Sequence, residues 1–281
     1  MSSEVPGSPS RPSRAGRDLR AAIAVGVVLG AAIIMSLLMF RHVYIGIVAA
    51  AAAVSTVELA GALRRGAEIR ISLVPVLIGG QAMIWLSWPL GLRGLVLAFA
   101  ITVLGCLVWR LRNGADGYLR DTAASVFTAA YVPMFAGFAA MLTVPEDGGF
   151  RALAFMFGVV ASDTGGYAFG VFLGRHPMAP KISPKKSWEG FAGSMVTGVV
   201  VGVLSLTLLL DGQWWHGVVF GAAVVCSATL GDLLESVIKR DLGVKDMGTM
   251  LPGHGGLMDR MDSLLPSAVV AWGILFWLVP G

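Results

Sequence analysis

The stretch GFAGSMVTGVVVGVLSLTLLL, residues 190–210, contains no charged residue and is long enough to cross a membrane. A helix needs about 20 predominantly apolar residues to cross the roughly 30 Å of bilayer hydrocarbon. Eight further apolar segments of similar length occur at 21–40, 43–63, 71–90, 92–110, 122–143, 151–174, 214–233 and 263–280. We therefore predict an all-α fold, a polytopic transmembrane helical bundle of about nine spans.

The composition also favours a membrane bundle over a soluble domain. Hydrophobic residues make up 56% and charged residues 14% of the 281 residues, and the mean hydropathy is +0.77. Soluble domains carry about 25% charged residues. Cys106 and Cys226 both lie in apolar runs without the spacing of a zinc site, so we interpret them as packing or lipid-facing residues.

The chain divides into three predicted parts. Residues 1–20 are rich in Ser, Pro, Arg and Gly, which predicts a disordered basic tail. Residues 21–150 hold the first five spans, the first of which is too long for a signal peptide and is expected to be retained. Residues 151–281 hold the last four spans and two polar loops, 175–189 and 235–262, and form the expected catalytic region.

Basic residues gather on one side of the predicted bundle. The tail and the even-numbered loops contain all but three of the 21 Lys and Arg residues, and only Arg41, Arg93 and Arg151 fall on the other side. Loops rich in Lys and Arg stay in the cytoplasm. The chain is therefore expected to be a multi-pass protein of the plasma or inner membrane, with a cytoplasmic N-terminus and both polar loops facing the cytoplasm.

The loop 235–262 and its flanks carry two groups of carboxylates. If the preceding helix continues through residues 231–240, one of its faces presents Asp232, Glu235, Ser236 and Lys239. Asp259 and Asp262 lie three residues apart at the start of the last span. These charges could simply cap two helices, which would suit the helix dipole.

The density of polar residues favours a binding site over capping alone. Mg²⁺ prefers carboxylate oxygens together with phosphate oxygens and water. Lys and Arg neutralise further phosphate charge, and the glycines at 253, 255 and 256 allow close approach of backbone N–H groups. The loop therefore predicts a magnesium–phosphate site at the membrane surface.

A second polar cluster surrounds the loop 175–189. The run Ser162-Asp163-Thr-Gly-Gly166 interrupts an apolar segment. A carboxylate inside a span costs about 2.5–3.5 kcal/mol on insertion scales, so Asp163 needs a partner or an aqueous cavity. The run KISPKKSWEG follows at 181–190, although its lysines alone could anchor the chain to anionic lipid. Glu58 fits a packing role and a catalytic role equally well.

The pattern SVIKRDLGVKDMGTMLPGHGGLMDRMD, residues 236–262, resembles the phosphatidate cytidylyltransferases, or CDP-diacylglycerol synthases. The segments SDTG at 162–165 and SPKKSWEG at 183–190 resemble the same family. The resemblance covers about the last 120 residues. It implies transfer of CMP from CTP to phosphatidate with Mg²⁺, giving CDP-diacylglycerol and pyrophosphate for phospholipid synthesis.

The resemblance also implies roles for individual residues. Asp232 and Asp259 would bind the metal, with Asp262 and Asp246 as auxiliary ligands, and a second metal or a monovalent ion is left open. The catalytic group would comprise Asp232, Asp259, Lys239 and His254. Substrate binding would involve Ser162, Asp163, Lys185, Lys186, Ser187, Ser236, Arg240, Lys245, Gly255, Gly256 and Arg260.

The expected partners are CTP, phosphatidate and the lipid bilayer, with no nucleic acid, and a homodimer is left open. The nearest alternative is another CTP-dependent membrane lipid enzyme, either a polyprenol kinase or a CDP-archaeol-type synthase. A P-loop is absent from the sequence, which argues against a P-loop kinase. A transporter with a path through Glu58, Asp163 and Asp232 is a further alternative, but the polar residues crowd one face and the C-terminal half.

Overall fold

The computed structural model describes residues 34, 35, 37, 40–248 and 255–279. Its elements in chain order are α2 (Arg41–Ala67), α3 (Leu73–Leu111), α4 (Tyr118–Ala129), η2 (Ala130–Met134), α5 (Phe135–Met141), α6 (Gly148–Leu173), β1 (Pro177–Ala179), β2 (Ser183–Ser187), α7 (Trp188–Leu209), α8 (Trp214–Asp241), α9 (Met258–Met261) and α10 (Leu264–Leu278). Within the described residues, seven helices are long and apolar enough to cross a membrane. The predicted tail and most of the predicted span 21–40 lie outside the described residues.

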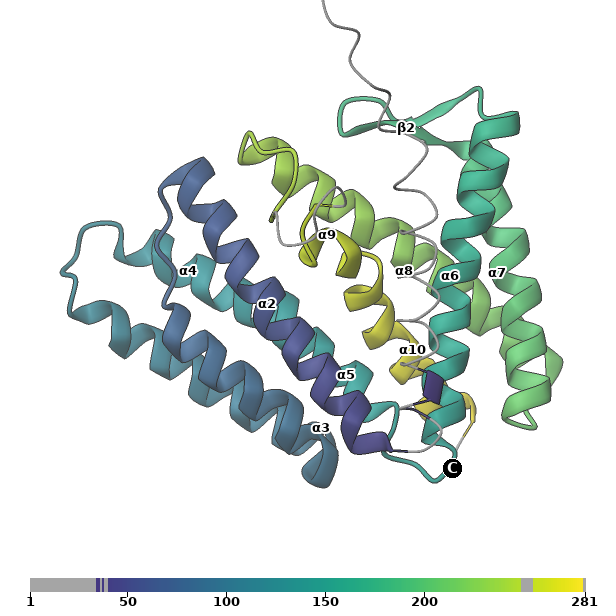
Figure 1. Cartoon of the computed structure of the whole chain (residues 1–281), viewed down its shortest axis with the longest axis horizontal. Helices are drawn as coiled ribbons and strands as arrows, with labels where there is room; N and C mark the ends of the chain where they lie inside the picture. The colour runs from purple at the N-terminus through teal and green to yellow at the C-terminus, as the bar shows by residue number, and fades with distance from the viewer. Residues whose placement is uncertain (1–33, 36, 38–39, 249–254, 280–281) are drawn as a thin grey trace, which may run out of the picture.

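The helix α3 contains two of the predicted spans, 71–90 and 92–110, folded back on each other (Figure 1). The backbone turns at Gly91, whose φ of 58° and ψ of −144° are essentially restricted to glycine. The hydroxyl of Ser72 donates to the carbonyl of Cys106 over 3.2 Å, which joins the far ends of the two halves. The break in the helix at Gly91 therefore falls between the two predicted segments.

The next span is one continuous path through α4, η2 and α5, from Tyr118 to Met141. Its centre is a π-helical turn that contains Pro133, which has no N–H to donate. Single π-helical turns within α-helices occur frequently at functional sites. The turn buries Tyr131, whose hydroxyl has no hydrogen-bond partner among the described residues.

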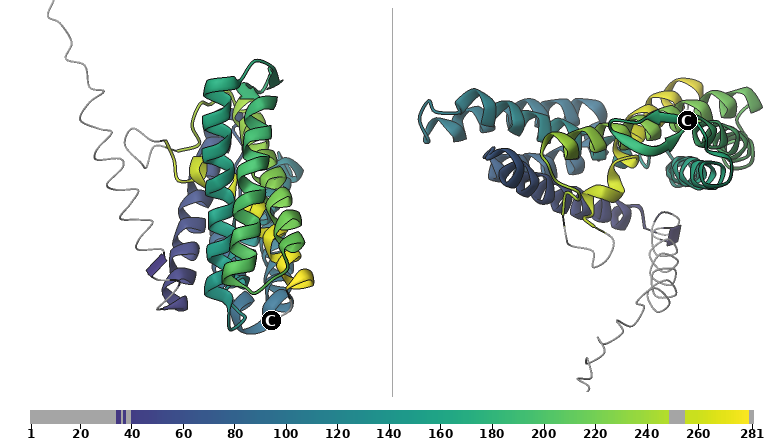
Figure 2. Two further views of the ribbon diagram at one scale, coloured as in Figure 1. Left: turned by 90° about the vertical axis from the view of Figure 1, so that its right-hand side faces the viewer. Right: turned by 90° about the horizontal axis from the view of Figure 1, so that it is seen from above.

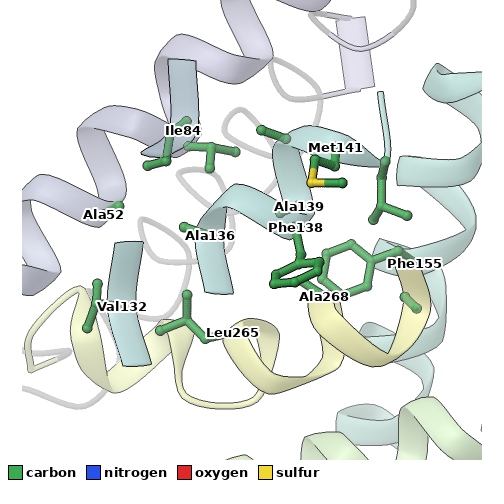
Figure 3. Close-up of a cluster of buried hydrophobic side chains, with 14 of the residues drawn as sticks. Ala52, Ile84, Val132, Ala136, Phe138, Ala139, Met141, Phe155, Leu265 and Ala268 are labelled. Carbon is green, nitrogen blue, oxygen red and sulfur yellow. The ribbon is translucent and has the colours of Figure 1, made fainter. Parts of the chain in front are cut away.

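The core lies where the N-terminal and C-terminal helices meet. Figure 1 shows α10 between α5 and α8, and α10 packs against α5, α6 and α8. Figure 3 shows the ring of Phe138 of α5 beside that of Phe155 of α6, with Ala268 of α10 nearby. Phe138 also meets Trp272 edge to face, with ring centroids 5.3 Å apart. The two halves of the chain thus share one packed interior.

Small residues let α6 and α7 approach closely, as helix packing in lipid requires. A Cβ on Gly165 would lie 2.0 Å from the Thr197 hydroxyl oxygen, so only glycine fits there. The hydroxyls of Ser194 and Thr197 donate to backbone carbonyls of α6 over 2.6 and 2.9 Å. This contact fixes the helix pair that carries the second polar cluster.

The loop between α6 and α7 forms an antiparallel hairpin of β1 and β2, a local exception to the predicted all-α fold. Figure 2 shows this hairpin at one end of the bundle and the end of α10 at the other. At that other end, Arg151 is buried and donates to the carbonyls of Leu275 and Val279. The described parts of the predicted polar loops therefore lie at the opposite end of the bundle from the end of α10.

Candidate active site

A cavity of about 420 Å³ lies beneath the hairpin, between the ends of α6, α7, α8 and the start of the last span. Its walls bring together residues from the two polar clusters that are far apart in the sequence. The predicted site residues that line it are Ser162, Asp163, Lys185, Lys186, Ser187, Asp232, Asp259, Arg260 and Asp262. Four carboxylates and three cationic side chains thus share one cavity.

Asp232 of α8 faces the hairpin across the cavity. Its Oδ2 lies 2.6 Å from the ammonium of Lys186 in β2. The same ammonium donates to the carbonyl of Thr229, one turn earlier in α8, over 3.3 Å. The predicted metal ligand and a predicted phosphate-binding lysine are therefore direct partners.

Lys239 joins the end of α8 to the start of the last span. Its ammonium lies 2.5 Å from Glu235 and 3.0 Å from Asp259. The contact with Glu235 follows from their spacing of four residues on one helix face. Glu235 is fully buried, and its Oε1 has no hydrogen-bond partner among the described residues.

Asp259 is held by the backbone as well as by Lys239. Its carboxylate accepts hydrogen bonds from the N–H of Met247 over 3.1 Å and from the N–H of Gly256 over 2.8 Å. Gly255 adopts a φ of +81°, and a Cβ there would approach both Asp259 and Asp246. The glycines thus shape the loop around Asp259, and the N–H of Gly256 binds this side chain.

Asp163 and Asp262 complete the acidic lining. Asp163 projects from α6 into the cavity, which provides the aqueous surroundings that its position inside a span requires. Ser162 is buried beside it, and its carbonyl accepts from Ser194. The N–H of Ser263 donates to Asp262 over 2.7 Å at the start of the last span.

The hairpin is attached at both of its ends. The Oε2 of Glu189 accepts from the N–H groups of Arg175 and His176, and its Oε1 lies 2.5 Å from Nδ1 of His176. The hydroxyl of Ser187 accepts from the N–H of Gly190 and so caps α7. These contacts hold Lys185 and Lys186 over the cavity.

Some predicted site residues do not line the cavity. Ser236 lies half-buried on α8, and Arg240, Lys245 and Asp246 are exposed around the loop that follows. Arg240 supports the hairpin, because its Nε donates to the carbonyl of Ile182 over 3.4 Å. His254 lies outside the described residues.

Other residues of the site were not among the sequence candidates. Glu235 shares the predicted helix face, and its burial is the property that the sequence could not reveal. Tyr167 and Phe191 line the cavity, but aromatic residues in apolar runs carry no distinguishing signal.

The donor set fits a magnesium ion that is completed by substrate. Within the described part of the chain, no group of three or more His, Cys, Asp or Glu side chains could hold a metal ion. Proteins usually bind Mg²⁺ with one or two carboxylates, and substrate phosphates and water supply the remaining ligands. Asp232 and Asp259 line the same cavity and provide hard oxygen ligands of this kind.

Comparisons with known proteins show the family to which the chain is similar. The chain matches the cytidylyltransferase family over residues 20–278. It is 49% identical to a phosphatidate cytidylyltransferase of Mycobacterium bovis, in an alignment covering 94% of this chain and 90% of that protein. It is 48% identical to a phosphatidate cytidylyltransferase of Mycobacterium leprae, over 93% of this chain and 89% of that protein. A Brucella suis protein of the same name is 34% identical over 64% of this chain and 66% of its own length.

Proposed function

This chain belongs to the phosphatidate cytidylyltransferases of the cytidylyltransferase family, and we propose that its hairpin-covered cavity is where CTP and phosphatidate react. The enzyme transfers CMP from CTP to phosphatidate and so forms CDP-diacylglycerol and pyrophosphate. One observation carries the proposal. Carboxylates of α6, α8 and the last span meet the lysines of the hairpin in a single cavity.

The reaction needs neutralisation and alignment more than proton transfer. A phosphate oxygen of phosphatidate attacks the α-phosphorus of CTP, and the bond from that phosphorus to the bridging oxygen breaks as pyrophosphate leaves. The attacking oxygen belongs to an ionised phosphate monoester, so a dedicated general base is not required. Two anionic reactants repel each other, and the site must supply positive charge and hold them in line.

Asp232 and Asp259 would hold Mg²⁺, with Asp262 and Asp246 as auxiliary ligands. A bound Mg²⁺ would neutralise phosphate charge and favour departure of pyrophosphate. Titration of the activity with Mg²⁺ and with monovalent cations would show whether a second ion also binds. Lys239 keeps Asp259 oriented toward the cavity through the 3.0 Å contact described above.

The cationic side chains would bind phosphate from two sides. Lys185 and Lys186 approach from the hairpin, and Arg260 approaches from the last span. We assign Arg240 and Lys245, at the exposed rim, to the outer phosphates of CTP. Ser162, Ser187 and Ser236 would add hydroxyl groups around the substrates, and His254 would meet the leaving group.

We also propose nine spans, with the N-terminus and the active site facing the cytoplasm of a plasma or inner membrane. The two folded halves of α3 support two crossings by that helix. The charge bias supports the orientation, since only three of the 21 Lys and Arg residues fall on the outer side. Two of these three are tied to nearby carbonyls: Arg41 donates to Pro145 and Arg151 donates to Val279.

Product analysis with labelled CTP tests the function. Purified enzyme with phosphatidate and Mg²⁺ should move an α-phosphate label into lipid and a γ-phosphate label into pyrophosphate. Chelation of Mg²⁺ should stop both transfers, and added Mg²⁺ should restore them. Appearance of the γ-label in the lipid, with release of CDP, would instead identify a kinase.

Asp259→Asn tests the assignment of the site. The amide keeps the shape of the side chain but loses its negative charge, so turnover should fall by about 10²–10³-fold or more. Asp211→Asn is a matched control in the loop at the other end of the bundle, and Asn tolerates the positive φ of 48° at that position. Near-normal activity of Asp259→Asn, in protein that purifies like the wild type, would contradict the assignment.

A further inference from the structure

The helix α2 belongs to the N-terminal half, yet one of its faces lies along the loop that holds Asp259. The hydroxyl of Ser55 lies 3.3 Å from the sulfur of Met261. Three residues later, Glu58 accepts from the N–H of Met258 over 2.8 Å. Two turns further on, Arg65 donates to the carbonyl of Met247 over 2.9 Å. This spacing places all three on one helix face.

The loop is shaped to receive the carboxylate of Glu58. A Cβ on Gly248 would lie 2.2 Å from Cδ of Glu58, and a Cβ on Gly256 would lie 2.6 Å from its Oε2. A side chain at either position would displace the carboxyl group of Glu58, and at Gly256 it would also meet the backbone N of Gly248. Glu58 therefore packs against Gly248 and Gly256 together.

Glu58 also has a feature that packing does not explain. Its Oε1 is buried and has no hydrogen-bond partner among the described residues. A buried oxygen without a partner costs free energy, and an apolar side chain would avoid this cost. The presence of a carboxylate despite this cost therefore indicates that the loop needs a hydrogen-bond acceptor at this position.

The backbone that contacts α2 is the backbone that holds Asp259. Met247 accepts from Arg65 through its carbonyl and donates to Asp259 through its N–H. Gly256 packs against Glu58 and donates to Asp259. Met258 donates to Glu58 and directly precedes Asp259 in the chain. Each backbone donor of Asp259 is thus adjacent to a contact made by α2.

We propose that Glu58 is a positioning residue of the active site, which holds the backbone at Gly248 and at residues 256–258 so that Asp259 points into the cavity. This inference rests on the proposed role of Asp259. Glu58 does not line the cavity, and it acts through the backbone. Replacing a residue that orients a metal ligand typically lowers the metal affinity or the activity by about 10–100-fold.

Three variants separate the hydrogen bond from the charge. Glu58→Ala removes the acceptor for Met258, and we expect kcat to fall about 10–100-fold and the Mg²⁺ concentration for half-maximal activity to rise about tenfold. Glu58→Gln keeps an acceptor oxygen and should remain within about threefold of the wild type. Glu58→Asp shortens the side chain and should give an intermediate loss, and it remains informative if Glu58→Ala does not fold. Glu68→Gln, at the exposed end of α2, is the matched control.

Hydrogen–deuterium exchange of the metal-free enzyme gives a readout that does not depend on activity. Peptides covering residues 255–262 should exchange faster in Glu58→Ala than in the wild type, and Glu58→Gln should restore the slow rate. Unchanged exchange and an unchanged Mg²⁺ requirement in folded Glu58→Ala would overturn the proposal. Lower yield of folded protein with a normal Mg²⁺ requirement would show a purely structural role and would also overturn it.

The product formed by the wild-type enzyme is measured in the same series. A failure of the proposed function would appear as a different wild-type product. A failure of the Glu58 proposal would appear only in the ratio of each variant to the wild type. The two outcomes are therefore distinguishable.

Discussion

Both aspartates proposed as the main metal ligands have a lysine as a direct partner. Asp232 contacts Lys186 over 2.6 Å, and Asp259 contacts Lys239 over 3.0 Å. Without substrate, these lysines offset negative charge that would otherwise be concentrated in one cavity. In the proposed site, the same lysines would lie next to phosphate oxygens when CTP and phosphatidate bind, and would exchange partners.

Lys186→Met tests this exchange. The substitution removes the cation that contacts Asp232 while keeping a side chain of similar length, so kcat/KM for CTP should fall about 10²-fold. Lys181→Met, in the exposed turn of the same hairpin, should change it less than about twofold. Steady-state kinetics with both substrates varied would provide the comparison. Equal effects of the two substitutions would show that only the overall charge of the hairpin matters.

Lys239→Met should destabilise the protein as well as inactivate it. The change leaves the fully buried Glu235 without its cation, and removing one partner of a buried pair costs about 3–5 kcal/mol. The double change Glu235→Leu with Lys239→Met should recover most of the thermal stability but not the activity. Tryptophan fluorescence during heating in detergent would measure the stability of both variants, and turnover of CTP would measure their activity. The exposed Lys245→Met is the control for stability.

The sequence predicted which residue types form the site better than it predicted their contacts. Asp232, Asp259 and Asp262 do lie together in one cavity, because helix periodicity and the turn before the last span bring them there. The pairing of Lys186 with Asp232 depends on a hairpin fold that spacing alone does not reveal. Glu58 lies 200 residues from its partner Met258, a separation that no local pattern encodes.

At the scale of the elements, the turn inside α3 rests on the backbone of a single glycine. No atom lies within 4 Å of a Cβ built on Gly91, so its positive φ alone requires glycine there. Apolar composition predicted the segments 71–90 and 92–110, and the structure places the break between them at Gly91. The direction in which the second half folds back depends on tertiary contacts such as that from Ser72 to Cys106.

Gly91→Ala should destabilise the protein by about 1–3 kcal/mol, because a side chain is strained at this φ and ψ. Gly46→Ala is the matched control, since its Cβ also meets no atom within 4 Å but the residue lies in the regular helix α2. Gly46→Ala should leave the stability of the protein unchanged or raise it, because Ala is favoured over Gly in helices by about 1 kcal/mol. Thermal unfolding of both variants would show the difference, and equal effects would exclude the backbone explanation.

For the whole molecule, the proposed orientation can be measured by chemical labelling. In a Cys226→Ser background, Gln213→Cys lies in the exposed loop between α7 and α8, and Lys181→Cys lies in the hairpin. A membrane-impermeant maleimide should label Gln213→Cys in intact cells and Lys181→Cys only after permeabilisation. The reverse pattern would invert the proposed topology.

The class of the fold was readable from the sequence because a helix must satisfy its own backbone hydrogen bonds in lipid. The arrangement of the helices was not, since apolar runs do not specify which faces meet. The position of α10 between α5 and α8 arises from contacts such as Phe138 with Trp272, which join distant parts of the chain. The hairpin was missed because strands this short have no clear periodicity in the sequence.

The contact between Glu58 and Met258 has a consequence for how the enzyme is made. Ribosomes add about 5–20 residues per second, so the 200 residues that separate the two partners take about 10–40 seconds to synthesise. During that interval α2 can enter the membrane while its partner loop does not yet exist. The proposed active site can therefore form only after residue 258 has been synthesised, and a nascent chain that stops before it would remain in the membrane as an inactive protein.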